Sequence, residues 1–107
     1  MTEAELLQAV RDLARLRGWL VYHTHRSDRS EPGFPDVIAV HPRTGHLLAV
    51  ELKSANGRIT RDQRAWLDAL QSAGVDARVW YPADLASGAI VRALSQPGRP
   101  VAAAAIP

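Results

Sequence analysis

The chain has 107 residues, of which 47% are hydrophobic and 22% charged, a composition that fits one globular domain with a single modest core. It contains no cysteine, which excludes disulfides and zinc–thiolate sites, and its formal net charge of +2 permits a nucleic-acid partner without requiring one. No run of about eighteen apolar residues is present, and residues 1–5 are acidic where a secretory signal is basic and then apolar. We therefore expect a cytoplasmic protein with no membrane span.

The first helix is predicted from its start signal. Thr2 and Glu5 have the spacing of a capping box, and apolar residues then recur at helical spacing until Gly18. The recurring residues are Leu6, Val10, Leu13 and Leu16. Residues 19–22 follow as a first strand, and residues 24–35 form a polar loop that is long enough to suggest a function.

Two further apolar runs predict a β-hairpin. Residues 36–40 and 47–53 read as strands, and the turn residues 41–46 between them favour antiparallel pairing. A second capping box, Thr60 with Gln63, then starts a helix whose apolar face carries Trp66, Leu67, Leu70 and Ala73 and which ends at Gly74.

Residues 76–81 form a fourth predicted strand, and residues 83–95 a weaker last helix interrupted at Ser87-Gly88. The order αβββαβ plus a C-terminal helix predicts an α/β fold in which a mixed four-stranded sheet is flanked by helices. We assign residues 1–96 to one domain and expect residues 97–107 to be a loosely ordered tail, or to pack on a neighbouring subunit.

Three charged residues at the ends of the hairpin strands suggest a chemical site. Side chains alternate along a strand, so Glu51 and Lys53 project to the same face. Asp36 opens the strand that pairs with residues 47–53, so its carboxylate should converge with that of Glu51. Carboxylate oxygens are the ligands that Mg²⁺ or Mn²⁺ prefers, and the backbone carbonyl of Leu52 could add a third. Such an ion would support phosphodiester hydrolysis, with Lys53 acting on the attacking water or on the phosphate.

Each of these residues also has a plain structural interpretation. Asp36 could simply begin a strand after a proline, and Glu51 with Lys53 could be a surface ion pair of little energetic value. Gln63 could either cap its helix through Thr60 or face the strand ends, and Glu5 has the same two possibilities through Thr2.

The ordered set of motifs resembles the VRR-NUC family of the PD-(D/E)XK nuclease superfamily. The residues that carry the resemblance are Glu5 with Gln8, Gly18-Trp19, Gly33-Phe34-Pro35-Asp36, Glu51-Leu52-Lys53, Gly57-Arg58 and Gln63. The resemblance implies a restriction-endonuclease-like core and an Mg²⁺- or Mn²⁺-dependent endonuclease. It also implies that Asp36 and Glu51 bind the metal, that Lys53 is catalytic, and that Glu5 and Gln63 support the site.

The resemblance further implies the partners. Stand-alone phage and bacterial members of this kind act on branched or structured DNA, including Holliday junctions, and are similar to homodimeric resolvases. The resemblance therefore implies a homodimer in the cytosol of a bacterium or of a phage-infected host.

Basic and polar residues around the predicted site are candidates for DNA contact. Arg58, Arg61 and Arg64 recur every three residues across a helix start, where the helix N-terminus itself favours anions. The other candidates are His23, His25, Arg26, Ser27 and Arg29. A His-x-His metal pair at residues 23 and 25 is a less favoured interpretation, because no third ligand accompanies it.

Two functions of other classes stay open from the sequence. A non-catalytic, structure-selective DNA-binding module of the same fold would bind DNA without cutting it. An assembly protein that uses its alanine-rich tail would show neither cutting nor salt-dependent DNA affinity.

Overall fold

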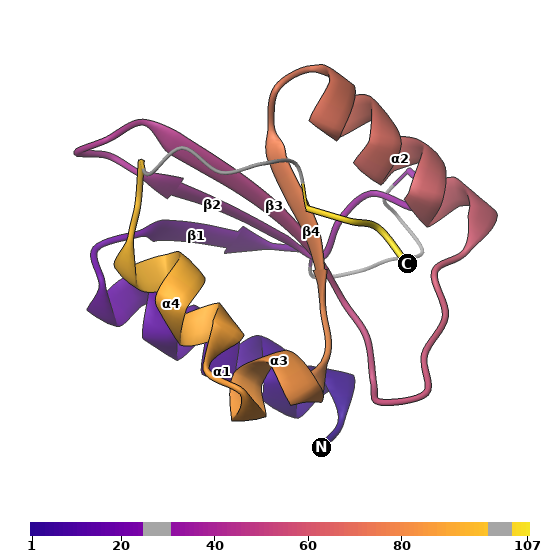
Figure 1. Ribbon diagram of the computed structural model, residues 1–107, viewed down its shortest axis with the longest axis horizontal. Helices are drawn as coiled ribbons and strands as arrows, with labels where there is room; N and C mark the ends of the chain where they lie inside the picture. Colours follow the sequence, from indigo (N-terminus) through magenta and orange to yellow (C-terminus); the bar gives the residue numbers. More distant parts are fainter. Residues whose placement is uncertain (25–30, 99–103) are drawn as a thin grey trace.

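The computed structural model describes residues 1–24, 31–98 and 104–107 (Figure 1). Its elements, in chain order, are α1 (Glu3–Leu16), β1 (Leu20–His23), β2 (Val37–His41), β3 (His46–Leu52), α2 (Arg61–Ser72), β4 (Asp76–Trp80), α3 (Pro82–Ala86) and α4 (Ala89–Ser95). The four strands form one sheet in the order β1-β2-β3-β4, in which β1, β2 and β3 are antiparallel and β4 runs parallel to β3. The predicted α/β fold with a mixed four-stranded sheet is therefore confirmed.

Both predicted helix starts are present as capping boxes. The Thr2 hydroxyl accepts a hydrogen bond from the Glu5 backbone, and the Glu5 side chain accepts one from the Thr2 backbone. Thr60 and Gln63 repeat this arrangement at the start of α2. Each box satisfies two backbone N–H groups that the helix itself leaves without acceptors.

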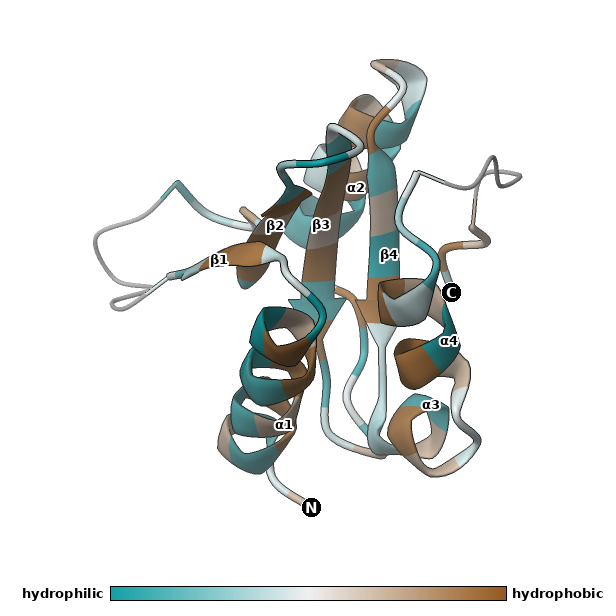
Figure 2. Ribbon diagram, turned by 90° about the vertical axis from the view of Figure 1, so that its left-hand side faces the viewer, coloured by the Kyte–Doolittle hydropathy of each residue, from teal (hydrophilic) through white to brown (hydrophobic). Residues whose placement is uncertain are grey.

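Helices cover both faces of the sheet and enclose two clusters of buried residues. In Figure 1, α1, α3 and α4 lie on one face and α2 on the other. Leu48, Val50 and Leu52 of β3 belong to the larger cluster, with α1 and α4, whereas Ala49 belongs to the cluster under α2. In Figure 2, β2 and β3 are largely hydrophobic between these layers. Because side chains alternate, Glu51 shares the α2 face with Ala49.

Two details differ from the prediction. Leu16 is 79% exposed, and the smaller Ala14 is buried in its place, because α1 ends at Leu16 and the chain turns at Gly18 with φ of 88°. The last helix is two helices: α3 ends at Ala86, and Gly88 adopts a left-handed conformation that breaks the hydrogen-bond ladder before α4 begins.

The described parts of the tail lie on the domain itself. Ile106 packs against the cluster under α2, the Gln71 side chain donates to the Ala104 carbonyl at 2.6 Å, and Arg64 donates to the Pro107 carbonyl. Gly98 donates its backbone N–H to His46 Nδ1 at 2.8 Å. The boundary between domain and tail stays a prediction. None of the described helices is long and apolar enough to cross a membrane.

Candidate metal and nucleic-acid site

Asp36 and Glu51 face each other across the β2–β3 pair. Val37 is opposite Val50 in the register, so the residue before β2 lies opposite the residue after Val50. The Asp36 Oδ2 atom accepts a hydrogen bond from the Leu52 backbone N–H at 2.8 Å, and the Asp36 carboxyl group is near enough to Glu51 to raise its pKa. The structure thus brings the two carboxyl groups together at the open end of the hairpin, as the hairpin geometry predicted.

Glu51 is buried, and its ionisation is strongly perturbed. Its side chain is 2% exposed, and no described residue donates a hydrogen bond to its Oε2 atom. Burial, then the hydrogen bond and charge of Asp36, raise the pKa of Glu51 to about 9, while Lys53 lowers it in part. Two carboxylates that touch in a low-dielectric site cannot both be ionised without a compensating positive charge. The pair therefore has the electrostatics of a cation site.

Lys53 lies directly after β3 and is half-buried, and its backbone N–H donates to the Trp80 carbonyl at 3.0 Å. Its side-chain stem passes over the following turn, because a Cβ atom at Gly57 would stand 3.2 Å from the Lys53 Cβ and Cδ atoms. Its positive charge acts on Glu51. The structure thus brings Asp36, Glu51 and Lys53 together.

A small cavity of about 120 Å³ opens beside this group. It is lined by Glu3, Ala4, Leu7, Thr24, Asp36 and Leu52. Glu3 also contributes to the raised pKa of Glu51, and the Thr24 backbone N–H donates to the Asp36 carbonyl at 3.0 Å. Glu3 and Thr24 are thus site neighbours that the sequence analysis missed. A signal for Glu3 was available, because it lies three, four and seven residues before Leu6, Leu7 and Val10, on the helix face that packs inward.

Glu5 and Gln63 use their side chains in the two capping boxes. Glu5 is exposed, and its hydrogen bonds with Thr2 lower its pKa. The Gln63 Oε1 atom accepts from the Thr60 backbone N–H at 2.9 Å, and the Gln63 backbone contacts the loop at Gly33. The structure therefore gives both side chains a capping bond, and a supporting role at the site stays a prediction for each.

The predicted DNA-contacting residues fall into two groups. Arg58, Arg61 and Arg64 are exposed at and just before the start of α2, and His23 lies half-buried on β1 opposite Val37. Arg58 also lines a hollow of about 280 Å³ with Gly57, Ile59, Tyr81 and Pro107. His25, Arg26, Ser27 and Arg29 lie outside the described residues.

Comparison with known proteins identifies the family. The family model of the VRR-NUC domain matches residues 2–84. The chain belongs to the VRR-NUC domain family. A solved structure titled "VRR_NUC domain" superposes with a TM-score of 0.61 at 23% identity, covering 74% of this chain and 84% of the other. A second, titled "VRR_NUC domain protein", gives 0.54 at 20% identity over 76% and 78% of the two chains. Both likenesses confirm the fold.

A curated relative is Fanconi-associated nuclease 1 of Ailuropoda melanoleuca. It is 37% identical over 49 residues, which are 46% of this chain but only 5% of that protein. This VRR-NUC chain therefore corresponds to a small part of the longer relative.

The donor set of this VRR-NUC domain fits a hard divalent cation. Over residues 1–24, 31–98 and 104–107, no group of three or more acidic or histidine side chains is arranged to hold a metal ion. Mg²⁺, however, needs only one or two carboxylates because it keeps several waters. The buried Glu51 Oε2 atom has no described donor, so a cation bound there would relieve the cost of its burial. Asp36 and Glu51 would hold the ion, and the Leu52 carbonyl as a further ligand stays a prediction.

Proposed function

We propose that this VRR-NUC domain is a metal-dependent DNA endonuclease that hydrolyses phosphodiester bonds in branched or structured DNA such as Holliday junctions. The observation that supports it best is the contact between Asp36 and the buried Glu51, with Lys53 beside them. The relative's name, a nuclease, is in agreement. The choice of branched DNA rests on the family resemblance of the sequence motifs.

The acidic and basic residues of the site have different roles in this proposal. Asp36 and Glu51 bind Mg²⁺ or Mn²⁺, which when bound polarises the phosphodiester and lowers the pKa of a coordinated water. Asp36 is oriented for this by its bond to the Leu52 N–H. Lys53 offsets the negative charge of the phosphate or orients the attacking water, and the exposed arginines at the start of α2 contact neighbouring phosphates.

The active form is proposed to be a homodimer. The described part of one chain supplies a single Asp36–Glu51 site, whereas symmetric cleavage of a junction requires two cuts. A twofold dimer would supply the two sites in related orientations.

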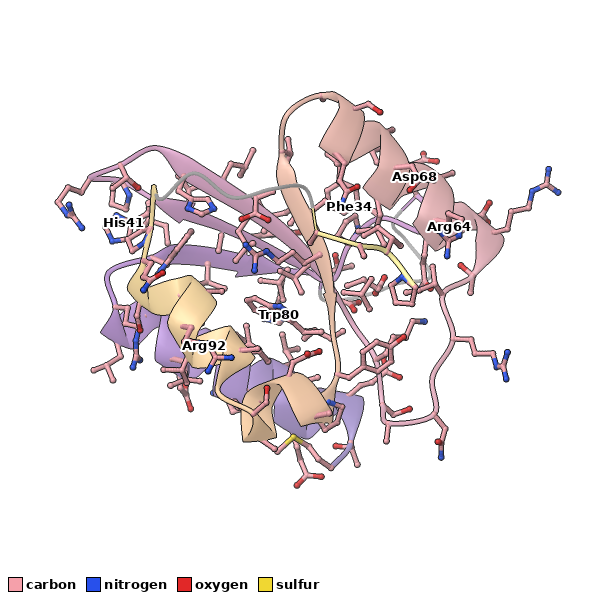
Figure 3. The ribbon with its side chains drawn as sticks, in the orientation of Figure 1. Phe34, His41, Arg64, Asp68, Trp80 and Arg92 are labelled. Carbon is pink, nitrogen blue, oxygen red and sulfur yellow. The ribbon has the colours of Figure 1, made fainter. Side chains whose placement is uncertain are left out.

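The direct test is cleavage of plasmid and four-way junction DNA with Mg²⁺ or Mn²⁺. We expect nicks or resolved arms from the wild type, and no product from Asp36→Asn, Glu51→Gln or Lys53→Ala, although all three variants still bind DNA. Asp68→Asn is the matched control, because Asp68 is an exposed carboxylate on α2 (Figure 3) that is not assigned to the site, and it should cut normally. Light scattering of the same samples measures the oligomeric state.

Two outcomes would contradict the proposal. Wild-type activity that survives EDTA would exclude a metal-dependent reaction. Salt-dependent DNA binding with no cleavage under any divalent cation would instead favour the non-catalytic binding module.

A further inference from the structure

The loop that precedes Asp36 lies directly against the first turn of α2. Gly33 has φ of +87°, and a Cβ atom there would stand 2.3 Å from the Asp62 carbonyl carbon and 2.7 Å from the Gln63 nitrogen. No side chain fits into that space. The backbone of the loop therefore touches the backbone of the helix, and only glycine permits the contact.

An aromatic pair holds the same two segments together. The rings of Phe34, next to Gly33, and Trp66, one turn into α2, have centroids 5.1 Å apart and planes at 86°. This is the edge-to-face arrangement that aromatic rings favour. Figure 3 shows Phe34 beside α2, in agreement with this contact. Trp66 is half-buried, so its ring serves this contact more than the central core.

Little conformational freedom separates this contact from the Asp36 carboxylate. Pro35 is buried, and its ring fixes one backbone angle. The Asp36 carbonyl accepts from the Thr24 N–H at 3.0 Å, and its Oδ2 atom accepts from the Leu52 N–H at 2.8 Å. A displacement at Gly33 would therefore be passed on to the carboxylate.

The same helix start carries the exposed arginines. Arg61 and Arg64 lie on the first turns of α2, beside the Asp62 and Gln63 backbone that Gly33 touches. The helix start and the Asp36 loop thus form one unit, which joins the cationic surface to a carboxylate of the site.

We propose that Gly33, Phe34 and Trp66 are positioning residues for the site. By fixing the loop of residues 31–36 on α2, they set both the geometry of Asp36 toward Glu51 and its distance from the arginines of α2. This inference rests on the proposed function, since it assigns a role toward the cation and the DNA of that site.

Comparing Gly33 with Gly74 distinguishes the effect of the loop–helix contact from the effect of left-handed backbone strain. Gly74, at the other end of α2, has φ of +88°, and a Cβ atom there meets nothing within 4 Å. Gly33→Ala and Gly74→Ala therefore impose the same left-handed strain, but only the first displaces the loop. Calorimetric titration with Mn²⁺ alone should show a Kd roughly ten- to a hundredfold higher for Gly33→Ala, the usual loss when a supporting partner of a metal ligand is removed. Gly74→Ala should bind as the wild type does.

The aromatic pair supplies a second test if Gly33→Ala does not fold. Trp66→Ala should raise the Mn²⁺ Kd and lower kcat for DNA cleavage, whereas Trp66→Phe, which keeps a ring, should restore both. Phe34→Ala combined with Trp66→Ala should cost little more than either alone, because the two rings act as one contact. A merely structural role would lower Tm and leave the Mn²⁺ Kd of the folded variant unchanged.

Mn²⁺ binding by the wild type and by the variants distinguishes a failure of this inference from a failure of the proposed function. A wild-type chain that binds no Mn²⁺ and cuts no DNA overturns both. A wild type that binds Mn²⁺, together with folded Gly33→Ala and Trp66→Ala variants that bind it equally well, overturns the inference alone.

Discussion

The carboxylate of Asp36 accepts a hydrogen bond at 2.8 Å from the backbone N–H of Leu52, across the open end of the β2–β3 hairpin. This bond uses one carboxylate oxygen and fixes the plane of the group. Leu52 is 2% exposed, so its N–H depends on a protein acceptor. Asp36 therefore has a structural task in addition to its proposed chemical one.

The two tasks of Asp36 can be separated by substitution. Asparagine keeps an oxygen that can accept from Leu52 but loses the negative charge, whereas alanine leaves the N–H without its acceptor. We expect Asp36→Ala to lower the free energy of unfolding by about 1 to 3 kcal/mol, and Asp36→Asn to stay close to the wild type, while neither cleaves DNA. Urea unfolding in EDTA measures the first effect. Equal destabilisation by both variants would contradict the structural role of the bond.

Glu51 should make the metal-free protein less stable as the pH rises. Its pKa is 4.5 in the unfolded reference and about 9 in the folded chain, so the folded state holds a proton that the unfolded state has released. This contribution is fully present below pH 4.5 and is lost as the pH rises through about 9. We expect the free energy of unfolding to fall by up to about 1.4 kcal/mol per pH unit in that window.

The measurement is urea unfolding at several pH values in EDTA. Glu51→Gln cannot titrate and should flatten the dependence, whereas Asp68→Asn, at an exposed site, should retain it. A wild-type stability that is constant between pH 5 and pH 8 would contradict the perturbed ionisation of Glu51.

The sheet and the carboxylate pair could be predicted because both follow from local patterns. Alternation places Glu51 and Lys53 on one face, and a hairpin of known strand ends places Asp36 opposite. The register, with Val37 opposite Val50, agrees with that prediction.

Other features depend on tertiary packing and could not be predicted in the same way. Contact between the loop and α2 at Gly33 joins segments that are far apart in the sequence. The burial of Glu51, which is 2% exposed, depends on how separate segments pack around the end of β3. The family resemblance implied a supporting role for Glu5, whose side chain caps α1, while the neighbouring Glu3 is the residue that lines the cavity.

Glu3 and Glu5 should therefore respond differently to substitution. Glu3 lines the cavity beside Asp36 and acts on Glu51 through its charge, whereas Glu5 is exposed and bonded to Thr2. Removing one charge near a divalent ion should weaken Mn²⁺ binding roughly five- to tenfold in Glu3→Gln. Glu5→Gln keeps a capping oxygen and should bind Mn²⁺ normally. Calorimetry measures the Mn²⁺ affinity of both variants. A larger loss of affinity in Glu5→Gln than in Glu3→Gln would show that Glu5, and not Glu3, is the neighbour of the ion.

The arginines at the start of α2 should control how DNA affinity depends on salt. Each phosphate contact that is lost should lower the slope of log K against log salt by about 0.9 on duplex DNA. We expect Arg61→Ala and Arg58→Ala each to do so, and Arg64→Ala as well, although Arg64 also donates to the Pro107 carbonyl. Arg43→Ala is the control, because Arg43 is exposed in the β2–β3 turn, at the end of the hairpin opposite Asp36. Fluorescence anisotropy with labelled junction DNA at several salt concentrations gives the slopes. If Arg43→Ala reduced the slope as much as Arg61→Ala, the attraction would come from overall charge, and the start of α2 would not be the DNA-binding surface.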